Sequence, residues 1–78
     1  MTAEIYTTPT CGYCKQAKSY LRELGISVRE KDIVRNPKYM DEFQKRMGGQ
    51  TGVPVIILKG AKIRGFDRNK IKKVLGIG

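Results

Sequence analysis

The sequence predicts an α/β fold, a four-stranded mixed sheet flanked by three helices in the order β-α-β-α-β-β-α. The chain has 78 residues, a length that suits one domain. Its apolar residues alternate between strand-like and helical spacing, with Gly or Pro at most of the changes. One strand–helix–strand unit precedes a helix and a hairpin, and this succession implies parallel and antiparallel neighbours. We therefore expect residues 1–78 to form a single domain with helices on both faces of its sheet.

The first strand and the first helix are predicted on either side of a Thr-Pro-Thr segment. Residues 3–7 form a short strand, which residues 8–10 interrupt because proline cannot donate to a strand ladder. From Cys11 onward the apolar residues recur at helical spacing. Gly25 is typical of the residue that follows a helix. The apolar stripe of this helix is Ala17, Tyr20, Leu21 and Leu24.

The second strand and the second helix follow directly. Residues 27–33 are rich in charge but carry Val28 and Ile33, which favours a strand at the edge of the sheet. Asn36-Pro37 marks a helix start, because asparagine is a preferred N-cap and proline is favoured at the first helical position. Gly48-Gly49 ends this helix. Its apolar stripe is Met40, Phe43 and Met47.

The last third of the chain predicts a hairpin and a helix. Residues 55–58 are an unbroken Val-Ile-Ile-Leu run, which indicates a strand buried on both faces. Gly60-Ala61, between Lys59 and Lys62, is predicted to be a two-residue turn with glycine first. The returning strand contains Ile63. Asp67 is expected to cap the last helix, whose inward side chains are Ile71, Val74 and Leu75.

The composition excludes several kinds of site. There is no histidine, so an imidazole base, a Cys–His pair and a histidine-ligated metal are excluded. Two cysteines are too few for the disulfide framework of a small secreted domain or for a four-thiolate metal site in one chain. No apolar run approaches the roughly 20 residues of a membrane span, and the N-terminus does not resemble a signal peptide. We expect a cytoplasmic protein without a resident metal or membrane contact.

The net charge of +9 raises the question of an acidic partner or nucleic acid. The 16 Lys and Arg residues are spread along the chain, and no run of five like charges occurs. Aromatic residues do not alternate with them as in a surface that stacks bases. A solvated basic surface is therefore the first interpretation, an acidic protein partner the second, and nucleic acid the last.

The sequence Cys-Gly-Tyr-Cys at residues 11–14 is typical of a dithiol redox motif, because it stands between a strand and a helix. Cys11 lies at or just before the helix N-terminus, where unpaired N–H groups and the macrodipole favour an anion. Lys15 and Lys18 add positive charge nearby. Cys14 lies inside the first turn and stays closer to an ordinary thiol. We expect Cys11 to attack a disulfide and Cys14 to resolve the mixed disulfide that forms.

A second motif, Thr51-Gly52-Val53-Pro54, leads into the strand at residues 55–58. Proline is tolerated at a strand start, which is the simplest interpretation of Pro54. An X-Pro bond beside an active thiol can also be cis and present the preceding backbone to a ligand. Together with the two cysteines, this functional interpretation is favoured.

With these motifs in place, the chain resembles a glutaredoxin-like protein of the thioredoxin fold over essentially its whole length. The resemblance is carried by the Cys-Gly-Tyr-Cys motif, by Val53-Pro54 and by Gly65-Phe66-Asp67. Glutaredoxins commonly have Cys-Pro-Tyr-Cys, so Gly12 departs from the family pattern and Tyr13 matches it. Gly65-Phe66-Asp67 resembles the Gly-Gly-x-Asp segment that binds a glutathione carboxylate. It resembles equally the Ser-Gly-Phe-Arg segment of redoxins that reduce ribonucleotide reductase.

The resemblance implies a thiol–disulfide oxidoreductase, or electron carrier, with Cys11 and Cys14 as its catalytic residues. In the family the proline at the position of Pro54 is cis, and the backbone of the preceding valine pairs with a cysteinyl substrate. Asp67 would meet a ligand amine in addition to capping its helix. The implied substrate-binding residues are Tyr13, Val53, Pro54, Gly65, Phe66 and Asp67.

The resemblance also implies partners. The expected substrates are protein disulfides, with ribonucleotide reductase as one candidate, and the expected state is a monomer. The electron donor is either glutathione, acting as reductant or co-substrate, or a thioredoxin-reductase-type flavoprotein. Two departures separate this chain from glutathione-dependent members: Thr8 stands where a lysine is common, and Gly52 replaces the threonine of Thr-Val-Pro. No tightly bound cofactor is expected.

Two other functions stay open. Some glutaredoxins with glycine or serine after the first cysteine bridge a [2Fe–2S] cluster between two chains, with glutathione supplying the remaining thiolates. Gly12 is compatible with such a carrier, whereas the altered glutathione positions argue against it. The third interpretation is a basic module that binds an acidic protein or nucleic acid.

Overall fold

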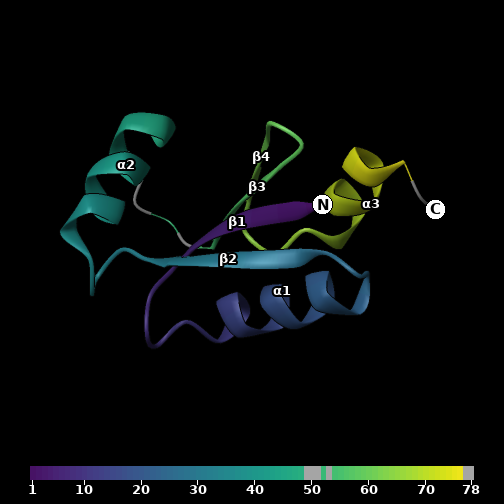
Figure 1. Cartoon of the computed structure of the whole chain (residues 1–78), viewed down its shortest axis with the longest axis horizontal. Helices are drawn as coiled ribbons and strands as arrows, with labels where there is room; N and C mark the ends of the chain where they lie inside the picture. The colour runs from purple at the N-terminus through teal and green to yellow at the C-terminus, as the bar shows by residue number, and fades with distance from the viewer. Residues whose placement is uncertain (49–51, 53, 77–78) are drawn as a thin grey trace.

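A computed structural model describes residues 1–48, 52 and 54–76, and contains the seven predicted elements in the predicted order (Figure 1). Each strand or helix begins within one residue of its expected position. The elements are β1 (Thr2–Thr7), α1 (Gly12–Glu23), β2 (Ser27–Asp32), α2 (Pro37–Met47), β3 (Val55–Leu58), β4 (Ala61–Arg64) and α3 (Arg68–Leu75).

The four strands form one mixed sheet in the order β2-β1-β3-β4. The β1–β2 pair is parallel, with Ile5 opposite Glu30, and α1 makes the crossover between them. The β1–β3 and β3–β4 pairs are antiparallel. The predicted edge position of residues 27–33 is confirmed, because β2 has β1 as its single neighbour in this sheet. The fold is the expected thioredoxin-like arrangement.

The helices cover both faces of the sheet, as predicted, and Figure 1 shows α1 and α2 on opposite sides. On one face, Leu21 of α1 and Ile71 of α3 pack with Ile5, Ile56 and Ile63 of the sheet. On the other face, the α2 residues Phe43 and Met47 pack with Tyr6 and Val55. Neighbouring residues of β3 therefore belong to the cores on opposite faces of the sheet, which explains its continuous apolar sequence.

The β3–β4 turn corrects the sequence prediction by one residue. The two loop residues are Lys59 and Gly60, with φ angles of 51° and 78°, and Leu58 pairs with Ala61. Positive φ at both loop residues is the requirement of a type I′ turn. The predicted Gly60-Ala61 turn would have placed Lys59 directly opposite Lys62, and like charges in that arrangement destabilise a hairpin.

The predicted helix boundaries are confirmed by their caps. The side chain of Asn36 accepts a hydrogen bond from the Lys38 N–H at the start of α2, and Pro37 is the first helical residue. The Asp67 carboxylate accepts from the Lys70 N–H, which confirms the predicted cap of α3. Gly48 ends α2 in the left-handed conformation, whereas Gly49 lies outside the described residues. The described helices include none with the length and hydropathy of a membrane span.

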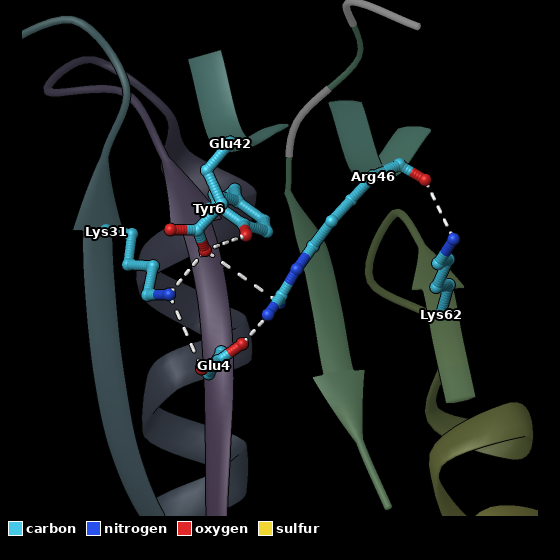
Figure 2. Close-up of polar contacts among 6 residues, drawn as sticks. All are labelled: Glu4, Tyr6, Lys31, Glu42, Arg46 and Lys62. Atoms are coloured by element: carbon cyan, nitrogen blue, oxygen red, sulfur yellow. Dashed lines mark hydrogen bonds and ion pairs between the residues drawn. The ribbon is translucent and has the colours of Figure 1, made fainter. Parts of the chain in front are cut away.

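An ionic cluster between α2 and the sheet was not predicted (Figure 2). Lys31 of β2 is 7% exposed and contacts the carboxylates of Glu4 and Glu42. The guanidinium of Arg46 contacts the same two carboxylates. The Tyr6 hydroxyl, which belongs to a fully buried residue, donates to Glu42. The cluster therefore joins β1 and β2 to Glu42 and Arg46, which lie one helical turn apart on α2.

Candidate active site

The turn before α1 places Cys11 at the helix N-terminus. The Cys11 N–H donates to the Thr8 carbonyl across 3.3 Å and closes the turn formed by residues 8–11. Pro9 occupies the second position of this turn, where its fixed φ is favourable. Cys11 has extended backbone angles, φ −84° and ψ 108°, and is the N-cap of α1. The predicted position of Cys11 is thus confirmed.

The sulfur of Cys11 takes the role of an N-cap oxygen. The Cys14 N–H donates to Cys11 Sγ across 3.2 Å. This N–H is one of the amide groups at the start of a helix that have no carbonyl partner within the helix. Together with the helix dipole, it favours negative charge on the sulfur that accepts its hydrogen bond. Cys11 is half-buried, so a substrate sulfur can approach it.

Cys14 has a different environment, although it lies only three residues away. Its side chain is 1% exposed, and both cysteines are free thiols in this structure. Burial raises the pKa of the Cys14 thiol to about 12, with a further rise from its contact with Cys11. The pair therefore combines an accessible sulfur at a helix start with a buried sulfur that stays protonated.

Glu30 is a neighbour of this site that sequence reasoning missed. Its carboxylate accepts from the hydroxyl of fully buried Thr7 and from the Lys18 ammonium, both across 2.9 Å. These hydrogen bonds, that of Lys18 first, lower the pKa of Glu30. The negative charge of Glu30 in turn contributes to the raised pKa of Cys14. No local sequence signal could have shown this contact, because it depends on the parallel register of β1 and β2.

The Lys18–Glu30 ion pair corrects the predicted electrostatics of the site. Lys18 lies one helical turn after Cys14, but its charge is directed to Glu30 on β2. Lys15 is exposed and has no ion-pair partner within the part of the chain that the structure describes. The positive charge expected near Cys11 therefore comes from Lys15 and the helix N-terminus, since Glu30 neutralises Lys18.

Two of the segments that carry predicted substrate-binding residues lie next to each other. The Gly65 N–H donates to the Pro54 carbonyl across 2.8 Å, so the residue before β3 is joined to the residue after β4. Gly65 has φ 74°, a left-handed conformation that glycine adopts without strain. Pro54 is buried and Asp67 is exposed. Val53 lies outside the described residues.

Phe66 and Tyr13 occupy separate surroundings. The Phe66 ring meets Tyr20 of α1 edge-to-face, with centroids 5.7 Å apart, and the Arg68 guanidinium lies over both rings. Phe66 therefore anchors the start of α3 to α1. Tyr13 is 66% exposed beside Cys11, which suits a docking residue. Within the described ranges, no hydrogen bond or ion pair links residues 65–67 to the cysteine turn.

The described residues contain no group of three or more Cys, Asp or Glu side chains arranged to hold a metal ion. The chain has two thiols, at Cys11 and Cys14, and the second of these is buried. The chemistry that this site supports is that of an accessible thiol at a helix start and a buried thiol whose pKa is raised.

Comparison with known proteins agrees with this geometry. The family model described as Glutaredoxin matches residues 3–63. A glutaredoxin-like 8.6 kDa protein in the rubredoxin operon of Clostridium pasteurianum is 36% identical over 72 residues, which cover 92% of this chain and 95% of that protein. Glutaredoxin 3 of Escherichia coli K12 is 42% identical over 64 residues, which cover 82% of this chain and 76% of that protein.

Solved structures show the same fold. The glutaredoxin-like protein NrdH-redoxin of Escherichia coli has a TM-score of 0.78 at 25% identity, covering 94% of this chain and 93% of that one. A thioredoxin-like protein has a TM-score of 0.86 at 21% identity, covering 97% and 96% of the two chains. This second likeness supports the fold alone.

Proposed function

This chain belongs to the glutaredoxin family of thiol oxidoreductases, and on that premise we propose that it reduces protein disulfides and mixed disulfides through Cys11 and Cys14. One observation carries the proposal. The Cys11 sulfur accepts the N–H of Cys14 at a helix start, while the Cys14 thiol itself is buried. The turn thus presents the first sulfur to a substrate at a helix start, whereas burial raises the pKa of the second thiol and keeps it protonated.

The proposed reaction has two exchange steps. The Cys11 thiolate attacks one sulfur of the substrate disulfide, an S–S bond forms to Cys11, and the other substrate sulfur leaves as a thiolate. Cys14 then loses its proton and attacks Cys11 Sγ. This step releases the second substrate sulfur as a thiolate and leaves a Cys11–Cys14 disulfide. Two electrons pass to the substrate, and each released thiolate takes up a proton according to its own pKa.

To complete the cycle, a donor must return two electrons to the Cys11–Cys14 disulfide. Glutathione and a thioredoxin-reductase-type flavoprotein are the two candidates. Glutaredoxin 3 and NrdH-redoxin, both of Escherichia coli, are similar to this chain in sequence and in fold respectively. Ribonucleotide reductase is one candidate substrate among protein disulfides, and the reducing cytoplasm is the compartment in which such a cycle operates.

A direct test uses the two cysteine variants. The reduced protein is mixed with insulin or with a glutathione mixed disulfide, and thiol release is followed. We expect Cys11→Ser to abolish reduction. Cys14→Ser should stop after the first step, with a covalent adduct on Cys11 that mass spectrometry identifies. Reduction that is unchanged in Cys11→Ser would disprove the proposal.

The donor is assigned by a second measurement on the oxidised protein. One reaction contains glutathione, glutathione reductase and NADPH, and the other contains a thioredoxin reductase and NADPH. NADPH consumption that depends on Cys11 identifies the donor. Asp67→Asn sharpens this assignment, because asparagine retains the cap but lacks the charge that would meet a glutathione amine. A raised KM for glutathione in this variant would support glutathione as the ligand.

A further inference from the structure

The positive charge of the chain is concentrated in its last third. Residues 55–78 contain seven basic residues and one acidic residue, a net charge of +6 out of +9. The first 54 residues contain nine basic and six acidic residues, a net charge of +3. Two thirds of the net charge therefore lies on residues 55–78, which contain the β3–β4 hairpin and α3.

Helix α3 is the centre of this charge. Four of its eight residues are basic, and the structure exposes all four: Arg68, Lys70, Lys72 and Lys73. We call these four residues the α3 basic face. Among the described residues no carboxylate lies within ion-pair distance of any of them, whereas Lys18, Lys31 and Arg46 all have acidic partners. Figure 1 shows α3 and α2 at opposite ends of the long axis of the molecule.

The arrangement within α3 opposes helix stability. Arg68 and Lys72 are four residues apart, and Lys70 and Lys73 are three apart, so like charges are neighbours on the helix surface. Arg68 and Lys70 also stand in the first turn, where the helix dipole disfavours cations. The single acidic side chain nearby, Asp67, is used as the N-cap. Repulsion of this kind is relieved when an acidic surface covers the helix.

The α3 basic face adjoins residues 65–67, the segment that joins β4 to α3. Arg68 directly follows Asp67 and lies over the rings of Phe66 and Tyr20. Gly65, at the other end of the segment, donates to the Pro54 carbonyl. A partner that contacts residues 65–67 would therefore meet the basic face at the same time.

We propose that the α3 basic face is the docking surface for an acidic region of the protein whose disulfide is reduced, an inference that rests on the proposed function. Two features favour a protein partner over other polyanions. α3 has no aromatic residue on which bases could stack. Its apolar side chains, led by fully buried Ile71, pack on the core and leave no apolar side to enter a membrane.

The test uses two disulfide-linked reporter peptides that differ only in charge. In each reporter a disulfide joins two Ala-Cys-Ala segments, one of which carries a fluorophore and the other a quencher. These segments are flanked by four Glu in one reporter and by four Lys in the other. The second-order rate constant for reduction by the reduced protein is measured at low salt and in 0.5 M NaCl. We expect the acidic peptide to react about 10-fold faster at low salt, because steering by a charged face raises association rates by about 10-fold or more. The preference should fall below about twofold at 0.5 M, where screening is strong.

Two triple variants with the same net charge locate the effect. Lys70→Gln/Lys72→Gln/Lys73→Gln should remove most of the acidic preference. Arg22→Gln/Arg29→Gln/Lys38→Gln, which removes three exposed cations elsewhere, should retain it. An equal loss in both variants would mean that net charge alone acts and would overturn the proposal. So would equal rates for the two peptides in the unmodified protein. If neither peptide is reduced, the proposed function itself fails.

Competition decides between a protein and other polyanions. A 20-nucleotide DNA oligomer and vesicles with anionic headgroups are each added at 150 mM salt. We expect neither to slow reduction of the acidic peptide. Inhibition by one of them that disappears in the Lys70/Lys72/Lys73 variant would overturn the proposal and assign the α3 basic face to that polyanion.

Discussion

The Cys14 N–H donates to the sulfur of Cys11 across 3.2 Å, so a backbone group of the buried cysteine stabilises charge on the accessible one. The contact exists because Cys11 is the N-cap of α1 and Cys14 lies three residues later, in the first turn. The same spacing that brings the two sulfurs within reach of each other also makes them chemically unequal.

The two cysteines should differ in their rate of alkylation. At pH 7 a thiol with a pKa of about 12 is ionised in about one molecule in 100,000, and Cys14 is also 1% exposed. Because the thiolate is the reactive form, iodoacetamide should modify Cys11 at least about 100-fold faster than Cys14. Peptide mass spectrometry over time measures both rates. Urea should equalise them, and similar rates in the folded protein would contradict the assigned roles.

The raised pKa of Cys14 predicts that the reduced protein loses stability in alkali. Below the unfolded-state pKa of about 8.5, the thiol is neutral in both states and its contribution is fully present. As pH rises from there towards about 12, the unfolded chain ionises first and is favoured. Urea unfolding at pH 7, 9 and 10.5 measures the loss. Cys14→Ala should lose less stability over this pH range. If the free energy of unfolding falls equally with pH in both proteins, this explanation is refuted.

The ionic cluster on the α2 side should stabilise the fold and make it sensitive to acid. Glu42→Gln leaves the buried ammonium of Lys31 with Glu4 as its remaining carboxylate, and we expect a loss of about 1–3 kcal/mol. Asp41→Asn is a matched control, because the Asp41–Lys45 pair is exposed and should contribute less than about 1 kcal/mol. Denaturant unfolding at pH 7 compares the two variants. Equal effects would mean that the cluster adds nothing beyond a surface ion pair.

The acid dependence follows from the same cluster. Hydrogen bonds, from Arg46 to Glu4 and from Lys31 to Glu42, lower the pKa of both carboxylates. A lowered folded-state pKa gives stability that is present above the unfolded value near 4.3 and is lost as pH falls through the folded value. Unfolding between pH 5 and pH 2 should therefore show a steeper loss in the unmodified protein than in Glu42→Gln.

Gly12→Pro should stabilise the protein. Gly12 is the first residue of α1, where proline is favoured, and a Cβ atom built there meets no other atom within 4 Å. The smaller conformational freedom of the unfolded chain should add about 0.4–1 kcal/mol. Gly25→Ala is the opposite control, because Gly25 has φ 77° and alanine there is strained. A lower melting temperature for Gly12→Pro would show that α1 does not begin at this residue in solution.

Asp67 should have a measurable structural role apart from any ligand. Asp67→Ala removes the hydrogen bond to the Lys70 N–H, and we expect a loss of about 0.5–2 kcal/mol. Asp67→Asn retains a capping oxygen and should restore most of this loss. Thermal unfolding of both variants separates the two effects. If Asn is as destabilising as Ala, the charge of Asp67 matters more than its cap.

The order of elements and the position of Cys11 follow from local sequence signals. Asn36-Pro37, Asp67 and the Val-Ile-Ile-Leu run each act over a few residues, through a cap or through the period of apolar side chains. The N-cap role of Cys11 is equally local, because it depends on where the strand-like period stops. Such signals act within short segments and do not depend on how the rest of the chain packs.

The one-residue error in the β3–β4 turn shows where local signals fail. Glycine was predicted at the first loop position, and the structure has it at the second, with Lys59 in a left-handed conformation. Which residue pairs across the hairpin depends on charges and side chains along both strands. A preference for a turn type cannot decide that register.

The sequence by itself therefore determined the α/β order, the family resemblance and the start of α1 at Cys11, because these depend on residues close together in the chain. Only the tertiary structure decided that Glu30 takes the charge of Lys18 beside Cys14, and that Lys31 lies buried between Glu4 and Glu42. These contacts join residues 11 to 27 positions apart. Their formation depends on the parallel register of β1 with β2 and on the sheet face that α2 covers, and both are settled when the whole chain packs.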